Sequence, residues 1–178
     1  MRIFIALDIP GEIRARLLEY MERVRSYAPD ARWARVEGLH VTLKFVGEAS
    51  EELVGQMKSA LAAVKAAPVV VKFEGVGFFP NARAARVFWA GVDGGENLSR
   101  LAGEIDARLA THGLQREEKA YHPHLTLARA STHPLRELAP LMDQKPQFGT
   151  MTAREFFMYQ SQPQRGGSKY TKLERFEL

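Results

Sequence analysis

Two short motifs with the same chemical groups stand 84 residues apart, at positions 40 and 124 of this 178-residue chain. Each places a histidine two residues before a threonine, in His40-Val41-Thr42-Leu43 and His124-Leu125-Thr126-Leu127. In a β-strand, residues i and i+2 lie on the same face. Each motif would therefore present an imidazole and a hydroxyl side by side.

Together the two motifs suit the chemistry of a phosphodiester. A neutral histidine can take a proton from an attacking water, and a protonated histidine can give one to the leaving oxygen. Threonine hydroxyls can donate hydrogen bonds to the phosphate oxygens as negative charge builds there. We therefore predict that His40 and His124 are the catalytic acid and base, and that Thr42 and Thr126 bind the phosphate.

Two cations near the motifs are further candidates for the phosphate site. Lys44 lies two residues after Thr42, so alternation allows it to face the phosphate or to extend its ammonium group to solvent. Arg129 lies three residues after Thr126 and is on the opposite face unless the strand ends or bulges there. Alternation alone favours a surface salt bridge for Arg129.

We expect no metal or other cofactor. His122 and His124 are spaced like a pair of ligands, but Gly38 occupies the corresponding place before the first motif. Neither motif contains an aspartate or glutamate to complete a ligand set. The chain has no cysteine, which excludes disulfides, thiolate zinc sites and a cysteine nucleophile.

The segments that lead into the motifs also resemble each other. Residues 2–6 (RIFIA) precede the first motif at the same distance as residues 86–90 (RVFWA) precede the second. Between strand and motif, apolar residues recur at helical spacing in both segments, at Ile13, Leu17, Met21 and Val24 and at Leu98, Leu101, Ile105 and Leu109. The pattern predicts a duplicated β-α-β unit and a single bilobal α+β domain over residues 1–178. Its halves are about 1–80 and 81–178, related by a pseudo-twofold axis, with the motifs facing each other across a cleft.

Further elements follow from local signals. Pro10 is expected near the start of the first helix, Asn97 as the N-cap of the later one and Gly113 at its end. Ser50 should cap a second helix, and a shorter helix is expected near 134–142. Strands are predicted at 69–73, with Phe78 and Phe79 beyond, at 155–160 and at 170–176.

Composition is that of a globular protein, with 46% hydrophobic and 26% charged residues. No apolar run is long enough for a membrane helix and no signal peptide is evident, so we expect a cytoplasmic protein without membrane contact. The formal net charge is +4. Basic residues between positions 14 and 35 suit either a polyanion or a solvated helix face paired with nearby glutamates.

Residues 40–48 (HVTLKFVGE) and 121–129 (YHPHLTLAR) resemble the twin motifs of the two-histidine phosphoesterase superfamily, most closely its bacterial and archaeal RNA 2′,3′-cyclic phosphodiesterases, historically called 2′-5′ RNA ligases. The resemblance spans nearly the whole chain and implies two antiparallel sheets flanking a cleft. It also implies hydrolysis of a 2′,3′-cyclic phosphate on RNA to a 2′-phosphate, with possible reverse 2′-5′ ligation. By position, His40 would be the general acid, His124 the general base, and Thr42, Thr126 and Arg129 the phosphate ligands.

The chain departs from the family pattern at 161–164 (SQPQ), where a more apolar stretch is usual. Pro163 is expected to end or bend the strand there. The residues that follow, 165–169, are interpreted as a basic flap over RNA or as a plain surface turn. Four aromatic residues are candidates for stacking on a base, namely Trp33, Phe45, Phe79 and Tyr121.

Three hypotheses remain open at this stage. The first is an RNA cyclic phosphodiesterase acting as a monomer. The second is a related two-histidine enzyme that acts on a small cyclic nucleotide. The third is a non-catalytic RNA-binding module, which would need exposed stacking aromatics but not two His-x-Thr motifs in matching positions.

Overall fold

The computed structural model describes all residues from 1 to 178. Its strands are β1 (Arg2–Leu7), β2 (Arg32–Trp33), β3 (Val41–Glu48), β4 (Val69–Phe79), β5 (Val87–Asp93), β6 (His124–Arg129), β7 (Gln147–Ala153), β8 (Glu155–Gln164) and β9 (Gly167–Glu177). Its α-helices are α1 (Gly11–Val24), α2 (Glu51–Ala62) and α3 (Gly95–Ala110). Short 3-10 helices are η1 (Arg25–Tyr27), η2 (Val36–Gly38) and η3 (Arg136–Asp143).

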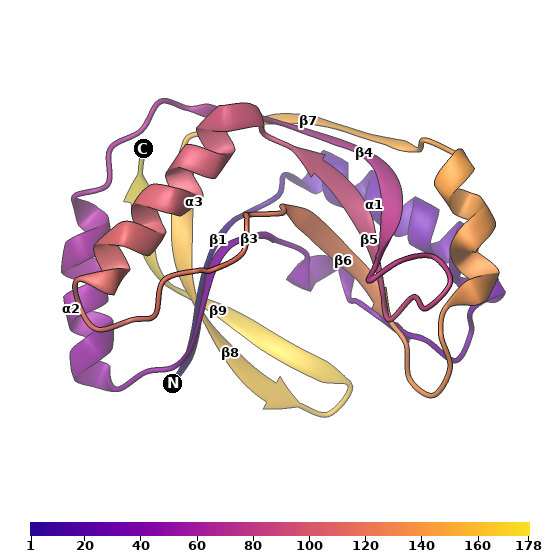
Figure 1. Ribbon diagram of the computed structural model, residues 1–178, viewed down its shortest axis with the longest axis horizontal. Helices are drawn as coiled ribbons and strands as arrows, with labels where there is room; N and C mark the ends of the chain where they lie inside the picture. Colours follow the sequence, from indigo (N-terminus) through magenta and orange to yellow (C-terminus); the bar gives the residue numbers. More distant parts are fainter.

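The strands form two sheets, and every pairing within them is antiparallel. The first sheet has the order β3-β1-β8-β9, and the second has the order β2-β6-β5-β4-β7. Figure 1 shows α2 and α3 beside the first sheet and α1 behind the second. The predicted α+β fold with two antiparallel sheets is confirmed.

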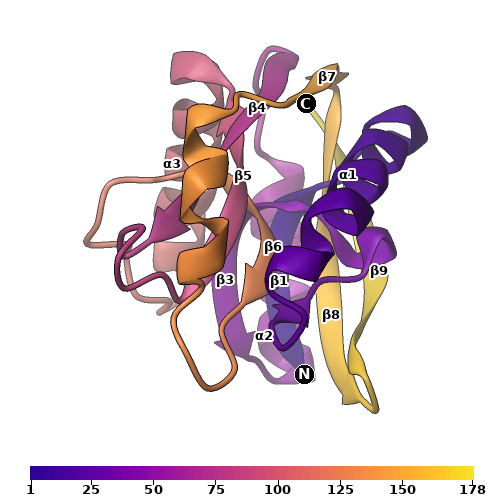
Figure 2. The same cartoon turned by 90° about the vertical axis from the view of Figure 1, so that its right-hand side faces the viewer.

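The two halves of the chain exchange elements, so a division near residue 80 does not separate the sheets. The first sheet combines β1 and β3 with β8 and β9 from the end of the chain, and the second includes β2 and β4 from the first half. Helix α1, which follows β1 in the chain, packs on the second sheet through Tyr20, whose ring meets Phe148 edge to face. Helix α3, which connects β5 to β6, contacts β3 of the first sheet. Figure 2 shows α1 and α3 on opposite sides of the molecule.

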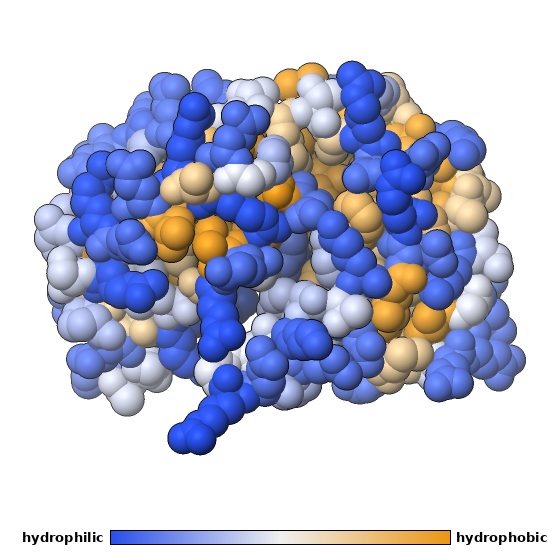
Figure 3. All heavy atoms as spheres, turned by 180° about the vertical axis from the view of Figure 1, so that it is seen from behind, coloured by the Kyte–Doolittle hydropathy of each residue, from blue (hydrophilic) through white to orange (hydrophobic).

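One hydrophobic core runs through both sheets and their covering helices. A continuous cluster of 44 buried residues includes the predicted apolar face of α1 and that of α3. On the surface drawn in Figure 3, hydrophobic residues gather in small separate patches among hydrophilic ones. No helix is long and apolar enough to cross a membrane.

Both motif strands are irregular at the same place. In the first sheet, Ala6 lies opposite Thr42 but Ile5 lies opposite Lys44, so Leu43 has no partner. In the second sheet, Trp89 lies opposite Thr126 but Phe88 lies opposite Ala128, which leaves Leu127 without one. An extra residue of this kind is a β-bulge, and it reverses the face of the residues that follow it, in β3 as far as a second extra residue at Val46.

The strand pairing also changes the alignment of the internal repeat. The two motifs correspond at an offset of 84 residues, but the strands that pair with them do not. Ala6 lies opposite Thr42, and the residue opposite Thr126 is Trp89 rather than Ala90. The segments 2–6 and 86–90 therefore correspond with a shift of one residue from the alignment that their sequences suggest.

Several local predictions need correction. Helix α3 begins at Gly95 with Gly94 as its N-cap, so Asn97 lies inside the helix. Strand β8 runs through Pro163, which pairs with Ser168. β8 pairs with β1 only as far as Ser161, so the missing N–H of Pro163 falls where the strand has a single neighbour. Residues 167–169 belong to β9, and the turn before them is short. By contrast, the Ser50 side chain caps α2 as predicted, accepting a hydrogen bond from the Leu53 N–H.

Candidate active site

The two histidines are held in the same way. His40 lies just before β3, and its Nδ1 is 2.7 Å from the carbonyl oxygen of Gly38. His124 opens β6, and its Nδ1 is 2.8 Å from the carbonyl oxygen of His122. A carbonyl oxygen can only accept a hydrogen bond, so Nδ1 carries the proton in both neutral rings. This fixes the tautomer and leaves Nε2 as the basic nitrogen of each ring.

The fold brings the two histidines close to each other. Strand β3 contacts β6, and the charge of His124 is the smallest of the causes that act on the pKa of His40. The hydroxyl of Tyr121 donates a hydrogen bond of 2.8 Å to the carbonyl oxygen of Thr42. That bond ties the segment before β6 directly to β3. We call the face of each sheet that carries its histidine and threonine the inner face.

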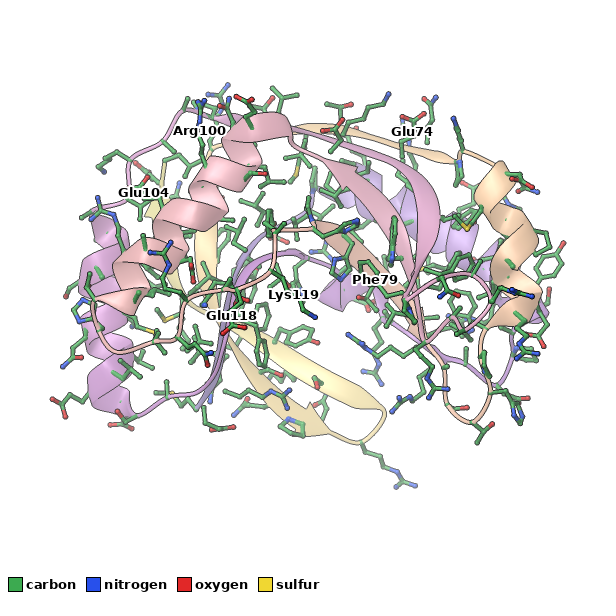
Figure 4. The ribbon with its side chains drawn as sticks, in the orientation of Figure 1. Glu74, Phe79, Arg100, Glu104, Glu118 and Lys119 are labelled. Carbon is green, nitrogen blue, oxygen red and sulfur yellow. The ribbon has the colours of Figure 1, made fainter.

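Each histidine is enclosed by aromatic side chains from its own sheet. His40 stacks on Phe4, with ring centroids 4.4 Å apart, and meets the edge of Tyr170 at 5.2 Å. His124 meets Phe79 edge to face at 4.9 Å, and Phe79 also contacts His122. In Figure 4, Phe79 lies on the second sheet, on the side that looks toward the first. Sequence reasoning missed Phe4 and Tyr170, because only the strand order shows that they flank His40.

Burial lowers the pKa of both histidines below the usual value, because an apolar surrounding disfavours the charged ring. The hydrogen bonds to backbone carbonyls oppose this shift in each case. The remaining charges differ between the two sites. At His40 the charges of Arg14 and His124 disfavour protonation and the Asp8 carboxylate favours it, whereas at His124 both His122 and Arg129 disfavour protonation.

The bulge in β6 places Arg129 on the inner face. Because the extra residue Leu127 reverses the alternation, exposed Arg129 shares the face of Thr126. Its effect on the pKa of His124 agrees with that position. The salt bridge favoured by alternation is absent, since no carboxylate oxygen lies within 4.0 Å of the Arg129 guanidinium.

The bulge in β3 removes Lys44 from the inner face, and both expectations for this residue are wrong. The Lys44 side chain is only 5% exposed, so its ammonium group does not extend to solvent. The ammonium group donates to Asp106 at 2.8 Å, to the carbonyl oxygen of Gln115 at 2.8 Å and to Glu117 at 3.0 Å. These bonds use all three of its donors and leave none for a phosphate.

The four aromatic candidates fall into two groups. The indole N–H of Trp33 donates to the Ala28 carbonyl, and its ring packs against buried Phe88; Tyr121 is bonded to Thr42. Both side chains have structural contacts. Phe45 is 51% exposed, contrary to the burial that alternation predicts, because the bulge turns it to the face of Thr42. Phe45 and Phe79 are therefore the two candidates on inner faces.

The chain nowhere brings three histidine, cysteine, aspartate or glutamate side chains together as a metal site requires. Near the second motif, His122 and His124 lie with their ring centroids 6.2 Å apart. The groups around the two motifs are thus two imidazoles, two threonines and the guanidinium of Arg129.

Comparison with known proteins places this geometry in a family. Residues 10–165 match the model of the 2′-5′ RNA ligase superfamily. A protein of Archaeoglobus fulgidus named RNA 2′,3′-cyclic phosphodiesterase is 34% identical over 180 residues, which cover 99% of this chain and 100% of that protein. A solved structure from Thermus thermophilus has a TM-score of 0.81 at 30% identity and covers 100% of this chain and 98% of that one. Escherichia coli LigT in complex with 3′-AMP has a TM-score of 0.81 at 28% identity, covering 99% and 97%. The family model and the relative from Archaeoglobus, each matching most of its length, show that this chain belongs to the 2′-5′ RNA ligase superfamily.

Proposed function

We propose that this protein hydrolyses the 2′,3′-cyclic phosphate at the end of an RNA strand to a 2′-phosphate. The observation that carries the proposal is the pair of neighbouring histidines, each with Nδ1 bonded to a carbonyl and Nε2 left as the basic nitrogen. The names of the relatives from Archaeoglobus fulgidus and Thermus thermophilus, both RNA 2′,3′-cyclic phosphodiesterases, support this choice of substrate.

In the proposed reaction, a water oxygen attacks phosphorus while the bond from phosphorus to the 3′ oxygen breaks. His124 takes the proton of the water, and His40 gives a proton to the departing 3′ oxygen. Thr42, Thr126 and Arg129 bind the phosphate oxygens, on which charge develops. With a 5′-hydroxyl in place of water as the nucleophile, the same steps would form a 2′-5′ bond.

Both rings lie near positive charge, and the carboxylate beside His40 is the feature that supports this division of roles. The Asp8 carboxylate favours the protonated form of His40, which a general acid requires, against the opposing charge of the Arg14 guanidinium. Arg129 and His122 favour the neutral form of His124, as a general base requires. No carboxylate acts on His124, so the opposite assignment would place the acid at the ring that has no nearby negative charge.

The test is a phosphorus NMR assay of the protein with EDTA and a short RNA that ends in a 2′,3′-cyclic phosphate. The expected product is a 2′-phosphate. A 3′-phosphate would mean that the other ester bond breaks and would overturn the assigned roles. If only cyclic mononucleotides react, the small-nucleotide enzyme is correct, and RNA binding without any turnover would favour the binding module.

The pH dependence of kcat/KM provides a further prediction. The productive form has His40 protonated and His124 neutral, so the rate falls above the pKa of His40 and below that of His124. Both pKa values are lowered from 6.5, and the profile should therefore be a bell with its maximum on the acid side of 6.5. Initial rates at low substrate concentration from about pH 4.5 to 9 would show it. A flat profile would contradict the paired histidines.

A further inference from the structure

The edge strand of the second sheet carries an arginine that the proposed reaction does not use. Arg32 on β2 lies directly opposite Arg129 on β6, and Arg129 lies directly opposite Val87 on β5. Residues directly opposite each other on neighbouring strands point to the same face. Val87 precedes Trp89 by two residues, and Trp89 lies opposite Thr126. Arg32 is therefore on the inner face, next to Arg129.

Two like charges in directly opposite positions repel each other, and such pairs destabilise a sheet. Nothing in the chain compensates for this pair, because no carboxylate lies within 4.0 Å of either guanidinium. Arg32 has one hydrogen bond, from Nη2 to the carbonyl oxygen of Ala130 at 3.3 Å, which leaves most of its five donors unused. An anion bound between or beside the two guanidiniums would remove the repulsion.

The position of Arg32 relative to the reaction identifies the anion. Arg129 shares strand β6 with His124 and Thr126, whereas Arg32 lies one strand farther out, at a strand spacing of about 4.8 Å. β2 is the outermost strand of its sheet, so no further strand covers that side. A chain that extends from the reacting phosphate over this edge would bring its next phosphate toward Arg32.

The segment that follows β2 carries more positive charge. Arg35 follows β2 and lies against the turn of the β8–β9 hairpin, where a Cβ added to Gly166 would meet its Nη2 at 2.9 Å. Arg165 and Lys169 are exposed on the same hairpin. These groups form a basic surface at the β8–β9 hairpin, of the kind that binds a nucleic-acid backbone.

We propose that Arg32 binds the phosphodiester group adjacent to the terminal cyclic phosphate, so that the protein prefers oligonucleotide ends to cyclic mononucleotides. This inference rests on the proposed function, since the reacting phosphate defines which phosphate is adjacent. It adds a binding position for the RNA backbone to the reaction centre. A mononucleotide has no group to occupy that position.

The test compares two substrates with one variant. Arg32→Gln removes the charge but keeps an N–H donor for the Ala130 carbonyl. It should lower kcat/KM at least about 10-fold for a pentanucleotide with a 2′,3′-cyclic end and less than 2-fold for 2′,3′-cyclic AMP. The slope of log kcat/KM against log salt should fall by about 0.7 for the pentanucleotide. Arg32→Lys should restore part of the loss, because it restores the charge.

Arg100→Ala is the matched control, since Arg100 lies on α3, far from the inner faces, in an exposed pair with Glu96 (Figure 4). Equal losses on both substrates, or no loss on the pentanucleotide, would overturn the role of Arg32. Fluorescence anisotropy would measure the affinity for the product, a pentanucleotide with a 2′-phosphate, independently of turnover. If no cyclic phosphate is hydrolysed, the proposed function fails, while a 10-fold weaker product complex in Arg32→Gln would still support this site. Unchanged binding would refute it.

Discussion

Replacing His124 by asparagine should lower kcat on a cyclic-phosphate RNA by between about 100-fold and 10,000-fold, and His40→Asn should have an effect of the same order. These are the losses expected when a general acid or base is removed. Asparagine keeps a polar group of similar reach and avoids the cavity that alanine would leave beside Phe4 or Phe79. Substrate binding should change much less than turnover, because the phosphate ligands remain in place.

Single-turnover rates and product analysis would measure the effect, with circular dichroism to show that each variant is folded. His112→Asn is the control, because His112 is exposed beyond the end of α3. Rates within about threefold of the wild type in either motif variant would contradict the assignment of that histidine.

The two variants should differ in how they respond to the leaving group. A general acid matters most when the leaving oxygen is a poor leaving group, so an activated diester such as bis(4-nitrophenyl) phosphate depends on it less. The loss in His40→Asn should therefore shrink on that substrate, while the loss in His124→Asn should persist. The reverse pattern would exchange the acid and the base.

Much of the fold could be predicted because its signals are local. The apolar spacing of Ile13, Leu17 and Met21 predicts α1, and the hydroxyl of Ser50 marks the start of α2. The motif strands could be recognised because alternation holds from His40 to Leu43 and from His124 to Leu127. The exchange of strands and helices between the sheets could not be predicted, since it depends on which apolar faces pack together over long distances.

The failures within the site share one physical cause. Strict alternation assigns Lys44 to the face of Thr42, and Phe45 and Arg129 to the opposite one. The extra residues Leu43 in β3 and Leu127 in β6 reverse all three assignments. Nothing in Leu43 or Leu127 marks a bulge, because its position is set by the pairing with β1 and β5. Equal spacing in the two motifs is nevertheless informative, since both strands bulge at the same position of the repeat.

The second large effect is expected on the stability of the fold, when the buried ion pair between Lys44 and Asp106 is broken. Lys44 and Asp106 are 5% and 9% exposed, and their charged groups are 2.8 Å apart. Burial alone would lower the pKa of Lys44 and raise that of Asp106. Their mutual hydrogen bond, together with Glu117 and Arg116, outweighs burial and shifts each pKa the other way. Each charge is therefore stable only because its partner is present.

Removing one partner leaves the other charge buried without compensation. Asp106→Ala should lower the free energy of unfolding by about 3–5 kcal/mol, as found when one member of a buried pair is deleted. Urea unfolding at pH 7 would measure it. Glu104→Ala is the control on the same helix, because Glu104 forms only a partly exposed pair with Arg108 and should cost less than about 1 kcal/mol.

The double variant Lys44→Met/Asp106→Leu separates a structural role from a catalytic one. Two apolar residues of similar volume can replace a buried pair at little cost, so the double variant should be more stable than Asp106→Ala. Since the Lys44 ammonium group has no donor left for a phosphate, kcat/KM of the double variant should stay within about threefold of the wild type. A loss of about 100-fold in kcat/KM in a fully folded double variant would show that Lys44 does contribute to the phosphate site. A double variant as unstable as Asp106→Ala would show a different role for the ion pair. The pair would then be required to hold residues 115–117 against α3 through its contacts with Arg116 and Glu117.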